Sequence, residues 1–185
     1  MTLYPYLLLL HIVGVIGLFI ALSLELVIVS RMHAAKTTTQ VHEWLTLSRV
    51  IDLVLPVSAA FILISGLALT LTAWGWGHAW IELSLGLLVL LGILGPVING
   101  PRMKAIQAAA QAAPVGEIPP ALRSVISTPV LRVYVPIPIL GALGAVIMMV
   151  LKLDWPGSGI VIALVLIGGL IFAFARKGES IQVAK

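Results

Sequence analysis

Residues 3–30 read LYPYLLLLHIVGVIGLFIALSLELVIVS, a hydrophobic run interrupted by one histidine, His11, and one carboxylate, Glu25. About 20 residues in a helix, each rising about 1.5 Å, cross the roughly 30 Å hydrocarbon core of a bilayer. The run is therefore long enough to span a membrane as one helix, and the rest of the chain is interpreted around it.

One face of this predicted helix carries His11, Gly14, Gly17, Ala21 and Glu25, because these residues follow one another at spacings of three or four. Small residues on such a face let neighbouring helices approach closely in lipid. An imidazole or a carboxylate exposed to acyl chains would be costly. We therefore expect this face to pack against other helices.

The composition is that of an integral membrane protein: of 185 residues, 61% are hydrophobic and 10% are charged, and the mean hydropathy is +1.16. The chain has no cysteine, which excludes disulfides, thiolate metal sites and cysteine nucleophiles. Any metal or cofactor must be held by histidine, methionine, carboxylate or backbone. The net charge of +4 comes from basic residues scattered at the predicted helix ends, so we expect the lipid bilayer and not nucleic acid as partner.

Five hydrophobic runs predict an all-α, polytopic transmembrane bundle that forms a single domain over residues 1–185. The predicted spans are residues 4–30, 50–73, 79–98, 129–151 and 160–175, with an inner loop at 102–128 in which residues 105–113 form a short interfacial helix. Residues 32–48 are interpreted as a polar loop, and Asn99-Gly-Pro101 as the end of the third helix. Thr128 followed by Pro129 predicts the start of the fourth helix.

The basic residues predict an orientation with the N-terminus outside and the C-terminus inside. This arrangement puts ten of the eleven lysines and arginines on the inner side and leaves Lys152 outside. The inner residues are Arg31, Lys36, Arg49, Arg102, Lys104, Arg123, Arg132, Arg176, Lys177 and Lys185. The tryptophan-rich link at residues 74–80 then lies at the outer surface, as in an aromatic belt.

The outer half of the predicted bundle collects potential ligands at one depth: His11, His78, Met148, Met149 and Lys152. Imidazole and thioether are the usual donors to haem b or copper when thiolate is absent. We therefore consider a cofactor site on His11, His78, Met148 and Lys152, or a metal site on His11, His78, Met148 and Met149. The simpler interpretation of His11 is a buried imidazole that hydrogen-bonds a neighbouring helix.

Four charged residues, Glu25, Arg49, Asp52 and Arg132, lie near the predicted inner ends of the first, second and fourth helices. One interpretation is an ion-pair set that neutralises carboxylates at the membrane boundary. The alternative is a proton relay.

Three short stretches carry a resemblance to a known group of proteins: residues 11–17 (HIVGVIG), 65–69 (SGLAL) and 148–152 (MMVLK). They resemble a bacterial family of predicted integral membrane proteins of unknown function, distantly similar to the copper-resistance D (CopD) proteins and to HemJ-type protoporphyrinogen oxidase. The resemblance implies a multi-pass protein of the bacterial cytoplasmic (inner) membrane. It also implies a haem-ligating role for His11 and matches Lys152 to the lysine that closes a later helix.

Three functions follow as hypotheses. The first is a haem b-binding redox protein with an axial histidine on the first helix. The second is a copper transport or tolerance protein, and the third is a non-catalytic scaffold or accessory subunit that forms a homo-oligomer or joins a membrane complex. No phosphate-binding loop, nucleophile elbow or zinc-protease motif is present, which disfavours soluble-type hydrolytic or nucleotide chemistry. The residues leave open whether the protein is an enzyme of another kind.

Overall fold

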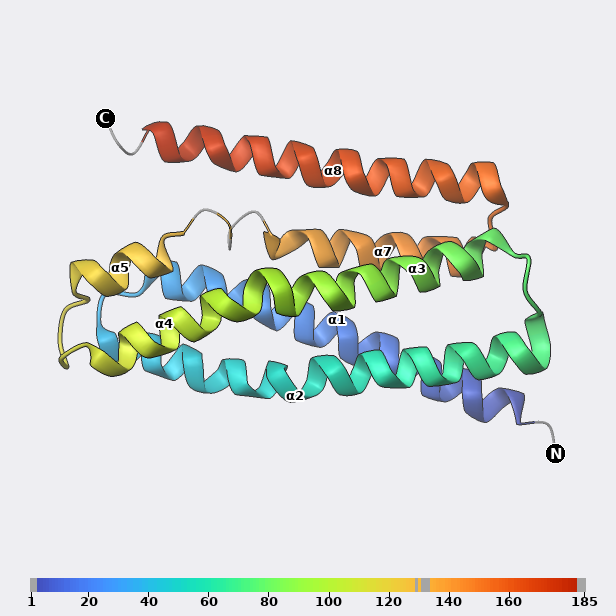
Figure 1. Cartoon of the computed structure of the whole chain (residues 1–185), viewed down its shortest axis with the longest axis horizontal. Helices are drawn as coiled ribbons and strands as arrows, with labels where there is room; N and C mark the ends of the chain where they lie inside the picture. The colour runs from blue at the N-terminus through green and yellow to red at the C-terminus, as the bar shows by residue number, and fades with distance from the viewer. Residues whose placement is uncertain (1–2, 129, 131–133, 183–185) are drawn as a thin grey trace.

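The computed structural model describes residues 3–128, 130 and 134–182, and of residues 173–182 the backbone alone. Every regular element in this part of the chain is a helix (Figure 1). In chain order they are α1 (Tyr4–Ala34), α2 (Thr38–Leu69), the π-helical turn η1 (Thr70–Trp74), α3 (Ala79–Leu94), the π-helical turn η2 (Gly95–Asn99), α4 (Gly100–Ala112), α5 (Pro120–Ile126), α7 (Pro136–Leu151) and α8 (Trp155–Gln182).

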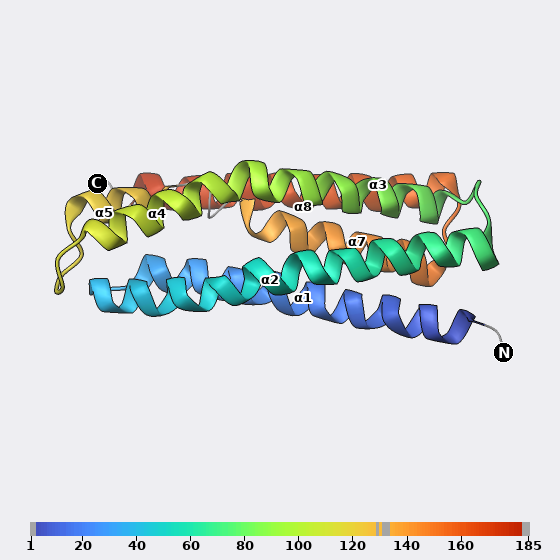
Figure 2. The ribbon, with the colours of Figure 1, turned by 60° about the horizontal axis from the view of Figure 1, so that its bottom comes forward.

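The long helices lie side by side along one axis, as Figures 1 and 2 show from two directions. The two helices of the hairpin α1–α2 pack closely along their length. A second group consists of α3, α7 and α8, in which α7 contacts both of the others. The contact between α2 and α3 is sparse, so the two groups meet mainly where α7 touches α1. A pocket lies in the space between the two groups.

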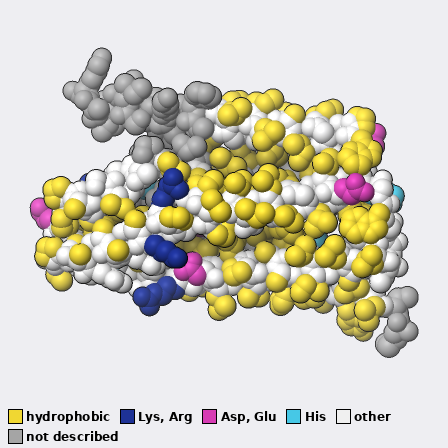
Figure 3. All heavy atoms as spheres, in the orientation of Figure 1, with side chains coloured by type: hydrophobic (Ala, Val, Ile, Leu, Met, Phe, Trp, Pro, Cys, Tyr) yellow, Lys and Arg dark blue, Asp and Glu magenta, His cyan; other side chains and the backbone are white. Residues whose placement is uncertain are grey.

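Four helical stretches are long and apolar enough to cross a membrane: Tyr4–Ala34, Thr38–Trp74, Ala79–Ala112 and Trp155–Phe172. The shorter apolar helix Pro136–Leu151 lies beside them. Large hydrophobic side chains cover much of the outside, as Figure 3 shows; Leu53 and Leu71 are 66% and 72% exposed. Such exposure is favourable in lipid and costly in water. The prediction of an all-α bundle of membrane helices is confirmed.

The predicted loop at residues 32–48 is wrong, because most of it is the first part of α2. Only three residues, 35–37, separate α1 from α2. Thr37 accepts a hydrogen bond from the backbone N–H of Gln40, whose side-chain oxygen in turn accepts from the N–H of Thr37. This reciprocal capping box satisfies two backbone donors that a helix start leaves unpaired, so the helix begins well before its apolar part.

The predicted inner loop at residues 102–128 contains two helices, α4 and α5, and the short helix expected at residues 105–113 corresponds to α4. The helix that begins at Ala79 does not end at Asn99 but continues through η2 into α4. Pro96 and Pro101 cannot donate the regular backbone hydrogen bond, and the wider π turn between them lets the helix pass without ending.

These extra helices form an apolar cluster at the end of the bundle where α1 and α2 are joined. Its fully buried members include Ile28 of α1, Val41 of α2, Ile106 of α4, and Leu122 and Ile126 of α5. The end of α1 is closed by Arg123, whose guanidinium donates to the carbonyls of His33 at 3.2 Å and Ala35 at 2.8 Å. Cations at this position satisfy the last carbonyls of a helix.

The contact between α1 and α2 is made by the face predicted from the sequence. A Cβ atom added to Gly14 would lie 2.9 Å from Ile62 Cγ1 and 3.1 Å from its backbone nitrogen, and one added to Gly17 would meet Ser58 Oγ. Ala21 is 1% exposed on the same face. The small residues therefore do what small residues do at membrane helix contacts: they let two backbones approach.

The predicted fourth helix is described only in part. Pro129 and residues 131–133 lie outside the described residues, so the proposed start at Pro129 is not tested. The hydroxyl of Thr128 donates to the carbonyl of Val125 at 2.8 Å. From Pro136 to Leu151 the chain is helical, as expected.

Candidate functional site: a pocket between two helix groups

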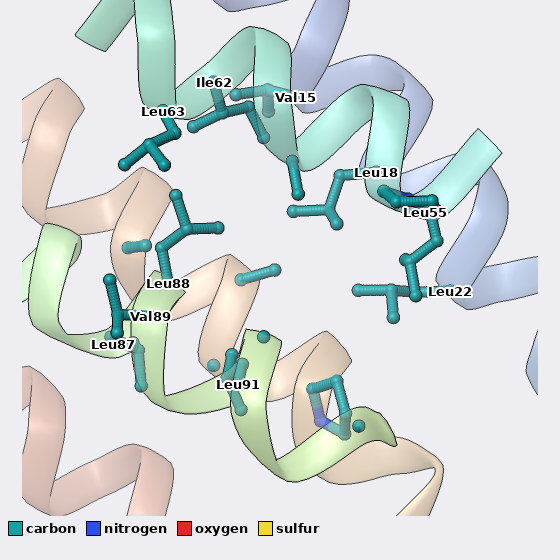
Figure 4. A pocket seen from close by; sticks show the side chains of 18 of the residues that line it. Val15, Leu18, Leu22, Leu55, Ile62, Leu63, Leu87, Leu88, Val89 and Leu91 are labelled. Carbon is teal, nitrogen blue, oxygen red and sulfur yellow. The ribbon is translucent and has the colours of Figure 1, made fainter. Parts of the chain in front are cut away.

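A pocket of about 840 Å³ lies between the α1–α2 hairpin and the group formed by α3 and α7. Figure 4 shows Leu18 and Leu22 of α1 and Leu55 of α2 on one side of it, and Leu88 and Leu91 of α3 on the other. Its size is in the range of sites for cofactors and other small molecules, which are mostly apolar with a few placed polar groups. We call this space the central pocket.

The central pocket opens sideways between α2 and the α3–η2 segment. Pro56 and Ala60 on α2 line it and are exposed, as are Val89, Gly92 and Pro96 on the other edge. The space-filling view shows mainly hydrophobic side chains on this face of the middle of the molecule (Figure 3). The opening therefore leads to surroundings that are apolar if the helices cross a membrane.

His11 forms part of the pocket wall and is 6% exposed. Its Nδ1 lies 3.2 Å from the carbonyl oxygen of Ile62 and 3.2 Å from Ser65 Oγ. The Ser65 hydroxyl donates its own hydrogen to the carbonyl of Phe61, so Ser65 Oγ acts as an acceptor toward the imidazole.

Both neighbours of His11 Nδ1 are thus acceptors, which assigns the proton of the neutral ring to Nδ1. Nε2 then keeps its lone pair, and it is buried with no hydrogen-bond partner in the described part of the chain. Gly66 makes this position possible, because a Cβ there would lie 3.2 Å from the ring's Cε1. The imidazole is held by one nitrogen and leaves the other available.

The two methionines near the end of α7 have different surroundings. Met149 lines the central pocket, as His11 does. Met148 is fully buried and packs with Trp80 and Ile81. Of the two predicted thioether donors, the pocket therefore contains Met149 and not Met148.

His78 and Lys152 lie beside Trp80 at one end of the bundle but are not among the residues that line the pocket. The Nε2 of His78 donates to the carbonyl of Trp74 at 3.2 Å, and its ring stacks on Trp80 with centroids 6.1 Å apart. The amino group of Lys152 lies 5.9 Å from the centre of the Trp80 ring. The structure does not bring His78 and Lys152 into one pocket with His11, and their predicted ligand roles stay predictions.

The half of the pocket nearer the α1–α2 link holds a second set of polar residues, Glu25, Asp52, Asn99 and Tyr134. We call them the inner polar cluster, after the side on which the sequence predicts them. The side-chain amide of Asn99 donates to Glu25 Oε1. Asp52 lines the same space as Glu25 and Asn99, and the Tyr134 hydroxyl lies near Gly95, 3.6 Å from where a Cβ would be. Two atoms of this cluster, Asn99 Oδ1 and Tyr134 Oη, are buried without a partner among the described residues.

The structure does not show the predicted pairing of Arg49 with the carboxylates, and it pairs Glu25 with Asn99 instead. Arg49 is exposed and makes no salt bridge within the described residues, so it does not pair with Glu25 or Asp52 there. Arg132 lies outside the described residues. The partner that the structure gives Glu25 is the neutral amide of Asn99, which sits in the wide turn η2.

Sequence reasoning missed Ser65, Asn99 and Tyr134 as site residues. Asn99 was attributed to a helix break, although an amide at the end of a long apolar run is a signal for a polar partner in a bundle. Ser65 was noted only as part of the SGLAL stretch. Tyr134 gives no signal in the sequence, because it joins Glu25 and Asn99 only through tertiary packing.

The comparisons with known proteins do not narrow the function. No family model matches the chain, and no curated protein and no solved structure matches it. Within the described residues there is also no group of three or more histidine, aspartate or glutamate side chains placed to hold a metal ion. The function is therefore argued from the pocket itself.

Proposed function

We propose that the chain is a multi-pass protein of the bacterial cytoplasmic membrane that binds haem b in the central pocket through His11 and carries electrons. The proposed topology has five spans, the N-terminus outside and the C-terminus inside. The distribution of basic residues supports this topology. Arg123 lies at the end where α1 and α2 are joined, whereas Lys152 lies over Trp80 at the other end. At that second end, the rings of Tyr4 and Trp74 are in contact, with centroids 6.5 Å apart.

The observation that supports a haem ligand is the state of the His11 ring. Histidines that bind metals usually donate their other N–H to a carbonyl or carboxylate, which fixes the tautomer and the ring orientation. His11 meets this condition through the carbonyl of Ile62, and its buried Nε2 is left with a lone pair. Residues 11–17 also resemble a family of unknown function that is distantly similar to HemJ-type proteins.

The pocket supplies the rest of the environment. Its wall is mainly leucine and other apolar residues, which would exclude water from a bound haem and lower the local dielectric. Of the two methionines near the end of α7, Met149 is the one that shares the pocket with His11. Haem, when bound, takes up and releases one electron at a time. The residues of this chain would orient it, exclude water and tune its potential.

The test is the reduced-minus-oxidised absorption spectrum of the detergent-purified chain, expressed with haem supplied. We expect a Soret band with sharp alpha and beta bands that is lost in His11→Ala. The control is His42→Ala, because the Nε2 of His42 donates to the carbonyl of Ala110 at the inner end, away from the pocket. A flat spectrum from folded, monodisperse wild-type protein would contradict the proposal, and so would equal haem content in His11→Ala.

A copper-handling protein is the second candidate, because His11 and Met149 together offer the nitrogen and sulfur donors that Cu(I) accepts. It predicts no visible haem spectrum. It also predicts competition with a Cu(I) chelator that weakens in His11→Ala and in Met149→Leu but not in Met148→Leu. A protein that binds neither haem nor Cu(I) would favour the scaffold or accessory-subunit hypothesis.

A further inference from the structure

The inner polar cluster is separated from His11 along the pocket. Glu25 follows His11 by 14 residues on α1, which corresponds to about 21 Å along a helix. A ligand held at His11 therefore does not satisfy Asn99 Oδ1 or Tyr134 Oη. The cluster requires an explanation that does not rest on the proposed haem.

The two atoms without partners are chemically complementary. Tyr134 is 6% exposed, and its hydroxyl can donate a hydrogen bond, whereas Asn99 Oδ1 can only accept one. Leaving such atoms buried and unpaired is costly. One donor and one acceptor in the same polar cluster match a ligand that carries carbonyl or hydroxyl oxygens.

The setting of η2 also points to a site. Wide π-helical turns inside α-helices occur frequently at functional positions. Gly95 begins this turn, and a Cβ built on it would be in ordinary van der Waals contact with the Tyr134 hydroxyl at 3.6 Å. Asn99 ends the turn, and its amide donates to Glu25. The two complementary groups therefore both lie at η2, which spans five residues.

The surroundings restrict the ligand further. The pocket opens between α2 and α3, where Pro56 and Gly92 are exposed, so a ligand would enter from the apolar side. Glu25 and Asp52 belong to the cluster, so a phosphate or carboxylate head would lie beside two carboxyl groups, which disfavours an anionic ligand. Lys104 lines the pocket farther along α4 and is exposed. The head group is therefore neutral, and the body is lipid-soluble.

We infer that the inner polar cluster binds the head group of a membrane quinone or its quinol. A quinone carbonyl would accept from the Tyr134 hydroxyl, and a quinol hydroxyl would donate to Asn99 Oδ1. The apolar tail would leave through the opening between α2 and α3. The leucines of the pocket, among them Leu55 and Leu91, fit a flat apolar ring and chain.

The experiment is equilibrium binding of decylubiquinone and of its reduced quinol to the full chain in detergent or nanodiscs. Decanoate, with a tail of the same length and an anionic head, is the comparison ligand. We expect saturable binding of quinone and quinol, and binding of decanoate at least about ten-fold weaker. Equal or tighter binding of decanoate would overturn the inference and would assign the pocket to an anionic lipid.

Two variants separate the roles of the cluster. Tyr134→Phe removes a donor without changing volume, so it should weaken the quinone about ten-fold and the quinol less. Asn99→Leu removes an acceptor, so it should weaken the quinol more than the quinone. Tyr6→Phe, at an exposed outer tyrosine, is the control and should change neither. Unchanged binding in both cluster variants would overturn the inference.

Thermal unfolding supplies a second readout on ligand-free protein. Because the Tyr134 hydroxyl has no partner in the described part of the chain, Tyr134→Phe should leave the Tm unchanged or raise it. A clear loss would show that the hydroxyl is structural and would contradict the inference. His11→Ala should keep the quinone affinity whether or not it abolishes haem, so failure of one proposal is distinguishable from failure of the other.

Discussion

The α1–α2 contact and the central pocket are built from neighbouring faces of the same two helices, but they differ in how polar atoms are treated. In the contact, Gly14 and Gly17 bring α2 close, and Ser65 donates to a backbone carbonyl. In the pocket, Asn99 and Tyr134 each bury an atom that has no partner within the described residues. The contact is complete without a ligand, and the pocket is not.

His11 belongs to both regions, since its Nδ1 is held by α2 while its ring lines the pocket. In this helix pair, one face therefore contributes mainly to folding stability and the neighbouring face mainly to ligand binding. Changes in the contact should act on folding, whereas changes in the pocket should act on ligands and leave folding nearly intact. Gly14→Leu and Ser65→Ala test the contact between α1 and α2, and Arg123→Ala tests the closed end of α1. They follow in order of decreasing expected effect.

Gly14→Leu should destabilise the protein by about 3 kcal/mol or more, because even a Cβ would lie 3.1 Å from the backbone nitrogen of Ile62. Loss of the monodisperse peak in size-exclusion chromatography, together with SDS-induced unfolding in mild detergent, measures the effect. Gly86→Leu is the matched control, since a Cβ there meets nothing within 4 Å. If both variants behaved alike, the close α1–α2 contact would be refuted.

Arg123→Ala should cost about 1.5–3 kcal/mol, because it removes two charge-assisted hydrogen bonds to the end of α1. Thermal unfolding of the purified protein measures this loss. Arg31→Ala, at an exposed arginine of the same helix end, should change stability by less than about 1 kcal/mol. Equal effects would mean that only the charge near the helix end matters and not the two bonds.

Ser65→Ala should have the smallest effect, about 0.5–1.5 kcal/mol, because His11 Nδ1 keeps the Ile62 carbonyl after losing Ser65 Oγ. Ser30→Ala is the control: it removes a hydroxyl bonded to the carbonyl four residues earlier, on an exposed surface, and should be nearly neutral. A Ser65→Ala protein as stable as the control would show that Ser65 contributes nothing to holding the imidazole.

The fold could be predicted from the sequence where a local pattern determines the outcome. The face of His11, Gly14, Gly17 and Ala21 packs against α2 as expected, because helical spacing alone places small residues together. The ends of the helices were less predictable. The T-x-x-Q signature at Thr37 indicates the start of α2, whereas the polar composition of residues 32–48 favours a loop. The structure follows the capping signature.

The site could be predicted only in part. His11 was identified because a lone imidazole in an apolar run is conspicuous, and its tautomer became assignable once Ile62 and Ser65 were in place. The inner polar cluster could not be assembled, because Glu25, Asn99 and Tyr134 are far apart in the sequence and meet through tertiary packing. Arg49 illustrates the reverse case: it is near Asp52 in sequence but is exposed and unpaired among the described residues.

The two wide turns, η1 and η2, can also be understood as insertions. A π turn contains one more residue than an α turn, so it absorbs an added residue while the helix on either side keeps its place. Trp74 in η1 and Asn99 in η2 both face the central pocket. A residue inserted at either turn therefore adds a side chain to the wall of the cavity, while the helices on both sides keep their packing.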